Sequence, residues 1–163
     1  MSLSWITTRH YPFRMRKEPA LGHDALVGVG GNLGEVPERF ERLWRYWQRS
    51  SQVRVVQSSP ILINPPFVYT DQPDFYNAVV HLKTALDPHA LLRYLLYTEK
   101  RFGRERSFAN APRTLDLDLI MYDHRTVETL RLSLPHPQWR GRDSVVMPLG
   151  QMKGVREWLK RVL

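Results

Sequence analysis

The chain has 163 residues, enough for a single domain with a substantial core, and its 42% hydrophobic and 25% charged residues are ordinary for a globular protein. It has no cysteine, which excludes disulfide bonds and thiolate metal sites, and no apolar run of about 18 residues that would predict a transmembrane helix. Its net charge of +8 predicts an anionic partner, such as a nucleic acid, a membrane surface or a nucleotide triphosphate. Because nothing in the composition indicates export or a membrane span, we expect the chain to be cytoplasmic.

The first 24 residues are basic and show no clear periodicity. They carry four arginine or lysine residues and no acidic residue before Glu18. Because the segment lacks the apolar core of a secretory signal, we interpret residues 1–24 as a basic N-terminal extension, with a transit peptide as the alternative. Residues 25–163 are predicted to form one domain.

Strand and helix patterns alternate through the first half of this domain. Residues 25–30 predict a buried strand that runs into a glycine-rich turn, and Leu33 excludes the dinucleotide-binding pattern, which needs glycine there. Apolar residues at i, i+3, i+4 and i+7 predict an amphipathic helix over residues 37–48. The β-rich residues 53–63 predict a second strand that ends before two prolines, and residues 75–82 begin a third.

The second half repeats the alternation. A leucine stripe predicts a helix over residues 88–102 that Gly103 ends, and a polar loop then leads to a strand at residues 115–122. A hairpin-like turn and a short strand follow, and apolar spacing from residue 155 predicts a terminal helix. The order β-α-β-β-α-β predicts a ferredoxin-like α+β sandwich, with a mainly antiparallel sheet and helices packed on one face of it.

The strand at residues 115–122 alternates strictly between leucine and aspartate. Leu115, Leu117 and Leu119 are predicted to face the core, while Asp116 and Asp118 stand roughly 7 Å apart on the other face. Two neighbouring anions repel each other, so arginines or a hard metal ion should relieve the repulsion, and Mg²⁺ is the natural candidate. The alternative is a half-buried strand whose two aspartates simply face water.

Arginine is concentrated in the loop before these aspartates. Arg104, Arg106 and Arg113 fall with the two aspartates within 15 residues. Because arginine suits bidentate contact with phosphate, this grouping favours an anion site over a solvated face. Further along, His136 is rigidly placed between two prolines, either as a structural residue or as part of the same cationic set.

Five motifs resemble those of the hydroxymethyldihydropterin pyrophosphokinase family of the folate pathway. The strand motif is PRTLDLD at residues 112–118. The other four follow in the family's order and approximate spacing: GGNLG at 30–34, DQPDFYNA at 71–78, residues 99–106, and LPHP at 134–137 with Arg142. The resemblance runs from about Val27 to Leu149.

The resemblance implies transfer of the β,γ-diphosphate of ATP to the hydroxymethyl group of 6-hydroxymethyl-7,8-dihydropterin, with release of AMP. Asp116 and Asp118 would hold two Mg²⁺ ions, and Arg104 and Arg113 would act as the other catalytic residues by stabilising the transferring diphosphate. The nucleotide-binding positions implied are Arg106, Arg113, Leu119, Arg131, Ser133, His136 and Arg142. Those implied for the pterin substrate are Gly30, Asn64, Pro65, Phe67, Phe75, Asn77 and Asp116.

The chain departs from the family pattern at Gly31, Asn64 and Phe67, which stand where serine, threonine and leucine are usual, and in two further places. The loop at residues 107–111 is about one residue short and lacks the usual Arg-Trp, which puts closure over the substrates in question. Ser144 stands where the family has a second pterin-stacking aromatic, so that Trp139, Phe67 or Tyr69 becomes the candidate to supply the missing ring face.

Two alternative functions follow from the same residues. A paralogue could bind pterin or nucleotide after losing catalysis through the altered loop, but the retained aspartates and arginines argue against it. A nucleic-acid-binding α+β module would use the net charge and the aromatics, but two outward carboxylates would repel phosphate unless metal-bound. We therefore expect a monomer that acts on small molecules and engages neither nucleic acid nor membrane.

Overall fold

The computed structural model describes residues 3–19, 22–66, 68–105 and 107–160. Two of the expected site residues, Phe67 and Arg106, lie outside the described residues. Within the described part of the chain, no helix is long and apolar enough to cross a membrane.

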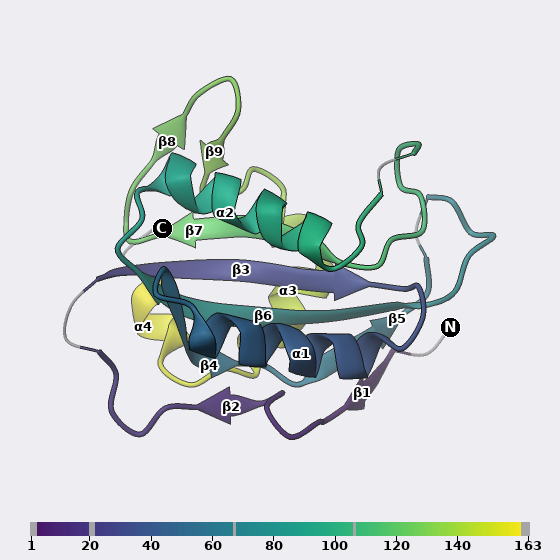
Figure 1. The fold of residues 1–163 in the computed structure, drawn as a ribbon, viewed down its shortest axis with the longest axis horizontal. Coiled ribbons are helices and arrows are strands. Elements are labelled where there is room, and N and C mark those ends of the chain that lie inside the picture. The colour runs from purple at the N-terminus through teal and green to yellow at the C-terminus, as the bar shows by residue number, and fades with distance from the viewer. Residues whose placement is uncertain (1–2, 20–21, 67, 106, 161–163) are drawn as a thin grey trace.

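One antiparallel sheet forms the centre of the molecule (Figure 1). Strand β3 (His23–Gly31) lies between β6 (Phe75–Thr84) and β7 (Asp116–Tyr122), and the outer side of β6 pairs first with β5 (Ile61–Asn64) and then with β4 (Val53–Ser58). Helices follow β3 and β6. This order and the antiparallel pairing confirm the predicted ferredoxin-like α+β fold.

The region predicted as one strand over residues 53–63 is two strands. Ser59 still pairs with β6, because its N–H donates to the Val79 carbonyl and its Oγ accepts from the Val79 N–H, each at 2.9 Å. Pro60, which follows, has no N–H with which to continue the ladder. The chain therefore leaves β4 and re-enters the sheet as β5.

Helices α1 (Val36–Arg49) and α2 (Pro88–Arg101) cover one face of the sheet, on the near side in Figure 1. The apolar stripe of α1 is buried in the main core, as its spacing predicted. Helix α2 begins at a proline, and the carboxylate of the preceding Asp87 accepts from the Ala90 N–H at 2.8 Å, which caps the first turn.

The opposite face of the sheet is also covered, whereas we expected helices on one face only. Helices α3 (Asp143–Gly150) and α4 (Val155–Lys160) lie behind the sheet in Figure 1. They pack on apolar side chains that β3, β6 and β7 present on that face, namely Leu26, Val79, Ile120 and Met121. Before α3, the chain forms a small hairpin of β8 (Val127–Glu128) and β9 (Ser133–Leu134) and a short 3₁₀ helix, Trp139–Gly141.

The N-terminal segment is joined to the sheet. Strand β1 (Ser4–Ile6) pairs with β5, and β2 (Phe13–Arg14) pairs with β4, both antiparallel. Between them, Tyr11 is fully buried in the main core. The boundary that we placed after residue 24 falls inside β3.

Candidate active site

The alternation along β7 separates its side chains as predicted. The side chains of Leu117 and Leu119, with Leu115 just before the strand, lie in the core under α1 and α2. The carboxylates of Asp116 and Asp118 lie on the other face, with 28% and 39% of their side chains exposed. The two aspartates are thus held by a buried strand and open to a ligand.

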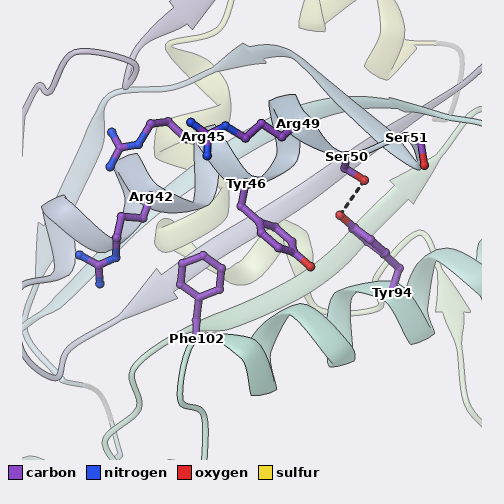
Figure 2. Close-up of a pocket in the computed structure, with 8 residues that line it drawn as sticks. All are labelled: Arg42, Arg45, Tyr46, Arg49, Ser50, Ser51, Tyr94 and Phe102. Carbon is purple, nitrogen blue, oxygen red and sulfur yellow. Dashed lines mark hydrogen bonds between the residues drawn. The ribbon is translucent and has the colours of Figure 1, made fainter.

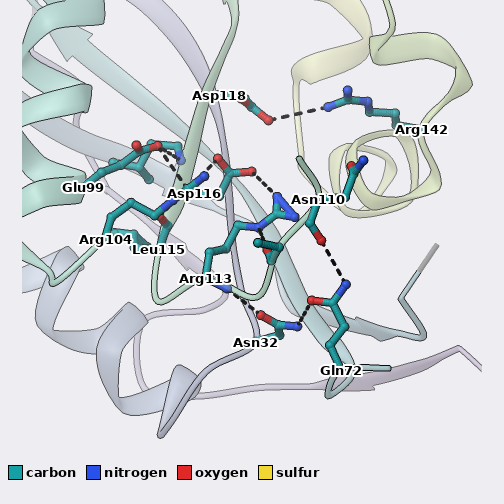
Figure 3. Close-up of polar contacts among 12 residues, drawn as sticks. Asn32, Gln72, Glu99, Arg104, Asn110, Arg113, Leu115, Asp116, Asp118 and Arg142 are labelled. Carbon is teal, nitrogen blue, oxygen red and sulfur yellow. Dashed lines mark hydrogen bonds and ion pairs between the residues drawn. The ribbon is translucent and has the colours of Figure 1, made fainter. Parts of the chain in front are cut away.

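Two arginines neutralise Asp116 (Figure 3). Nη1 of Arg104 lies 3.1 Å from Oδ1 of Asp116, and Nη1 of Arg113 lies 3.6 Å from its Oδ2. Nη1 of Arg104 also donates to the Leu115 carbonyl at 2.9 Å, which fixes the guanidinium against the start of the strand. Arginine is therefore one answer to the predicted repulsion between the aspartates.

Glu99 of α2 supports this arrangement from beneath. Its side chain is buried, and its Oε2 accepts from the Leu117 N–H at 2.7 Å and lies 3.9 Å from Nη1 of Arg104. We did not predict a role for Glu99. The sequence did contain an indication, because Glu99 follows Leu95 by four residues and therefore places an acidic side chain on the buried stripe of the helix.

Asp118 is less well neutralised. Its Oδ2 lies 3.6 Å from Nη1 of Arg142, whose Nη2 donates to Gln138 Oε1 at 2.8 Å. Burial and the neighbouring charge of Asp116 raise the pKa of Asp118 to about 7, against the opposing effect of Arg142. A bound cation at this carboxylate would relieve the same repulsion.

The donor set fits a magnesium ion. Among the described residues, no group of three or more His, Cys, Asp or Glu side chains gathers at one point, so this site offers a pair of carboxylates. Mg²⁺ is usually held by one or two carboxylates and completes its octahedron with water and phosphate oxygens. The pair on β7 provides that number of hard oxygen ligands.

A cavity of about 420 Å³ opens beside the aspartates. Burial and Arg142 lower the pKa of His136, one of its lining residues, although Asp116 acts in the opposite direction. The wall is mainly cationic and polar, which suits a chain of phosphates. It is formed by Arg104, Glu105, Ser107 to Arg113, Asp116, Asp118, His136 and Arg142.

Apart from Asp116 on β7 and Phe67, which is not among the described residues, the expected pterin-binding residues lie near the ends of β3, β5 and β6. Gly30 pairs with Asn77, and a Cβ at Gly30 would lie 2.8 Å from Asn77 Oδ1, so a larger residue would displace this amide from its present position. The Asn77 amide donates to Asn64 Oδ1 at 2.6 Å, and the Asn64 amide donates to the Pro65 carbonyl at 3.2 Å. The guanidinium carbon of Arg113 lies over the Phe75 ring, 4.9 Å from the ring centre. This contact joins the expected pterin-binding residues to the arginines.

Asn32 is a residue whose role we did not predict. It is 3% exposed, and its Oδ1 accepts from the Arg113 N–H at 2.9 Å while its amide donates to Gln72 Oε1 at 2.9 Å and the Pro73 carbonyl at 3.0 Å. Gln72 in turn donates to the Asn110 carbonyl at 3.1 Å (Figure 3). Asn32 therefore links the three loops at this end of the sheet. The sequence offered one indication of this role, which is that Asn32 is a polar residue within a glycine-rich turn.

The shortened loop carries an aromatic ring that we had not considered. Phe108 is 55% exposed, lines the cavity and meets Tyr69 edge to face at 5.2 Å. Of the candidate rings, Tyr69 is exposed, whereas Trp139 is largely buried among the apolar side chains that pack between α3 and the sheet. The ring contact and the Gln72 hydrogen bond both join the loop before β6 to the loop before β7.

Three expected nucleotide-binding residues stand apart from this group. Arg131 and Ser133 are exposed near the β8–β9 hairpin and are not among the described residues that line the cavity. The side chain of Leu119 is only 4% exposed and lies in the main core. A contact from Leu119 to a nucleotide would therefore have to come from its main chain.

Comparison with known proteins places this chain in a family. The profile of the 7,8-dihydro-6-hydroxymethylpterin-pyrophosphokinase family matches residues 26–154. The 2-amino-4-hydroxy-6-hydroxymethyldihydropteridine pyrophosphokinases of Helicobacter pylori and Campylobacter jejuni are 40% and 38% identical to the chain, over 88% and 89% of it and 90% and 92% of their own lengths. A folic acid synthesis protein of Dictyostelium discoideum is 33% identical over 77% of the chain and 19% of its own length. The chain belongs to the 7,8-dihydro-6-hydroxymethylpterin-pyrophosphokinase family, a family of diphosphate-transferring enzymes.

Proposed function

We propose that the protein transfers the β,γ-diphosphate of ATP to 6-hydroxymethyl-7,8-dihydropterin and releases AMP, in a reaction that requires Mg²⁺. The observation that carries the proposal is the pair Asp116 and Asp118, which face a cationic cavity in a chain of this family. Such a transfer needs little covalent chemistry from the protein, because positioning and charge stabilisation lower most of the barrier.

The residues around Asp116 and Asp118 would have different roles in binding the phosphates of ATP. Asp116 and Asp118 would hold two Mg²⁺ ions, which, when bound, neutralise phosphate charge and help to activate the attacking hydroxyl. Arg104 and Arg113 would donate to the transferring diphosphate, and their contacts with Asp116 support this role because they hold both guanidinium groups beside a carboxylate that would bind the metal. His136 and Arg142 would hold the rest of the nucleotide, with further contacts from Arg106, Leu119, Arg131 and Ser133.

The pterin would bind at the ends of β3, β5 and β6. The amides of Asn77 and Asn64 offer paired donors and acceptors to a polar heterocycle, and Gly30 leaves room for them. Phe75 offers a ring face for stacking, and Pro65 and Phe67 belong to the loop that would frame the ring. Phe108 and Tyr69 are the aromatics that we assign to the position left without a ring at Ser144.

The direct test is AMP release from ATP, with and without the pterin and with and without Mg²⁺. We expect AMP formation that requires both. If no AMP forms while calorimetry detects ATP or pterin binding, the chain is a catalytically impaired paralogue. If neither ligand binds, the assignment of substrates is wrong.

The remaining expectations belong to the same proposal: a monomeric cytoplasmic enzyme of folate synthesis that acts on small molecules and binds no nucleic acid. Size-exclusion chromatography with light scattering gives the molar mass in solution and so tests whether the protein is a monomer. Titration with labelled RNA and DNA at two salt concentrations tests the nucleic-acid alternative, because phosphate contacts would make the affinity fall steeply with salt.

A further inference from the structure

A second cavity, of about 570 Å³, lies between α1 and α2 (Figure 2). It is on the face of the sheet opposite to the one that carries the carboxylates of Asp116 and Asp118. One wall is α1 and the other is formed by Tyr94 in the middle of α2 and by Phe102, which follows the helix. We call this cavity the helical groove. It shares no lining residue with the cavity beside the aspartates.

The α1 wall of the helical groove is strongly basic. Arg42, Arg45 and Arg49 are spaced i, i+3 and i+7, so they share one side of the helix and span about 10 Å along its axis. All three are exposed, and no acidic residue is among those that line the groove. Within the residues that the structure describes, no carboxylate forms an ion pair with any of them. The groove therefore presents three uncompensated charges in a row.

The inner part of the groove is aromatic. The rings of Tyr46 and Phe102 meet edge to face, with centres 5.7 Å apart and planes at 86°, and both are half-buried. At the far end, the hydroxyl of Tyr94 donates to Ser50 Oγ at 3.0 Å (Figure 2). An apolar side chain could pack on the ring pair while acidic neighbours reach the arginines.

The row of charges and the aromatic interior together select an occupant. A small anion would meet one or two of the arginines, whereas an extended acidic segment, whose alternate side chains repeat every 6 to 7 Å or so, would reach all three. Single-stranded nucleic acid is less well matched, because the two rings contact each other instead of presenting parallel faces for stacking bases. A second copy of this chain is also a poor match, because each copy carries a net charge of +8.

We propose that the helical groove binds an acidic peptide segment of a partner protein. Carboxylates of that segment pair with Arg42, Arg45 and Arg49, and an apolar side chain of it packs on Tyr46 and Phe102. The proposal is independent of the reaction proposed for the other cavity.

The probe for the test is a fluorescein-labelled peptide of about a dozen residues in which glutamate and leucine alternate, followed by fluorescence anisotropy at near-physiological salt. The test variant changes Arg42, Arg45 and Arg49 together to serine. The matched control changes Arg9, Arg14 and Arg156 to serine; these are exposed and lie outside the groove. Both variants lower the net charge from +8 to +5, so general attraction falls equally in the two.

We expect the affinity for the peptide to fall at least about tenfold in the groove variant and less than about threefold in the control. A peptide with glutamine in place of glutamate should bind neither the wild type nor the variants. Equal losses in the two variants would mean that the charge of the whole molecule attracts the peptide, and would overturn the proposal. Tighter binding of a single-stranded oligonucleotide that depends on the same three arginines would overturn the assignment of a peptide.

Discussion

The two cavities described above use arginine in opposite ways. Beside β7, Arg104, Arg113 and Arg142 each face a carboxylate of Asp116 or Asp118, and two of them are largely buried. In the helical groove, three arginines are exposed and no acid lies among the lining residues. Paired charges are held in place before a ligand arrives, which suits stabilisation of a transition state. Unpaired charges remain hydrated and free to adapt, which suits binding.

The largest expected effect is at the aspartates. Replacing Asp116 or Asp118 with alanine should lower the rate of AMP formation by a factor on the order of 10³ or more, because the metal ligands and the anchor for the arginines are lost together. Asp118→Asn keeps the shape and removes the charge, so a similar loss in that variant would assign the effect to charge. Turnover within tenfold of the wild type in the alanine variants would defeat the mechanism.

The next effect is at the paired arginines. Arg113→Ala should reduce kcat by on the order of 100-fold with little change in KM, because its charge matters most when the diphosphate is in transfer. Arg113→Lys should recover only part of the loss, since lysine cannot make the paired contacts of a guanidinium. A rise in KM with kcat unchanged would make Arg113 a residue that binds the ground state.

A smaller effect is expected at the residue that positions Arg113. Asn32→Ala removes the acceptor for the Arg113 N–H and the donor to Gln72, so kcat should fall roughly tenfold and the free energy of unfolding by about 1–3 kcal/mol. Asn32→Asp keeps the acceptor but not the donor. An aspartate variant closer to the wild type in kcat than in stability would separate placement of Arg113 from attachment of the Gln72 loop.

A third charged cluster, formed by Asp24, His81 and Lys83, lines neither cavity and shows what paired charges contribute to stability alone. Asp24 accepts from His81 at 2.7 Å and pairs with Lys83 at 2.9 Å. Burial disfavours its charged form, but the hydrogen bonds from His81 and Lys83 outweigh burial and lower the pKa of Asp24 from 3.8 to about 2. Because the pKa is lower in the folded state, this carboxylate stabilises the fold above about pH 4, and the contribution is lost as the pH falls from 4 towards 2.

Urea denaturation across this range measures the effect. Between pH 5 and pH 2, the free energy of unfolding should fall by about 1 kcal/mol more in the wild type than in Asp24→Asn, a figure reduced for partial exposure. Equal falls in the two proteins would show that the pairs with His81 and Lys83 do not stabilise the fold.

The smallest expected effect is in the helical groove. The variant with serine at Arg42, Arg45 and Arg49 should unfold within about 0.5 kcal/mol of the wild type, because exposed and unpaired side chains contribute little to stability. Its rate of AMP formation should stay within about twofold. A loss of activity as large as that of Arg113→Ala would mean that the two cavities are coupled and not separate.

What the sequence predicted well depends on local patterns. The stripe of α1 and the leucine–aspartate alternation of β7 are set by the periods of helix and strand, and both are confirmed. The break at Pro60 was missed although a proline inside a strand pattern is a local signal. The packing of α3 on the far face was not predicted, because it depends on contacts between distant segments. Asn32 escaped notice for the same reason: its partners Gln72 and Arg113 are 40 and 81 residues away. The individual roles of the site residues stay predictions.

The pairing of β1 with β5 and of β2 with β4 has a consequence for solubility. Without them, β4 and β5 would present open N–H and C=O groups along one border of the sheet, a template on which strands of other molecules can add. The strands that cover this border are only three and two residues long, and β1 is mostly exposed. Such short outer strands offer little length for further addition, so the N-terminal segment protects the sheet against aggregation.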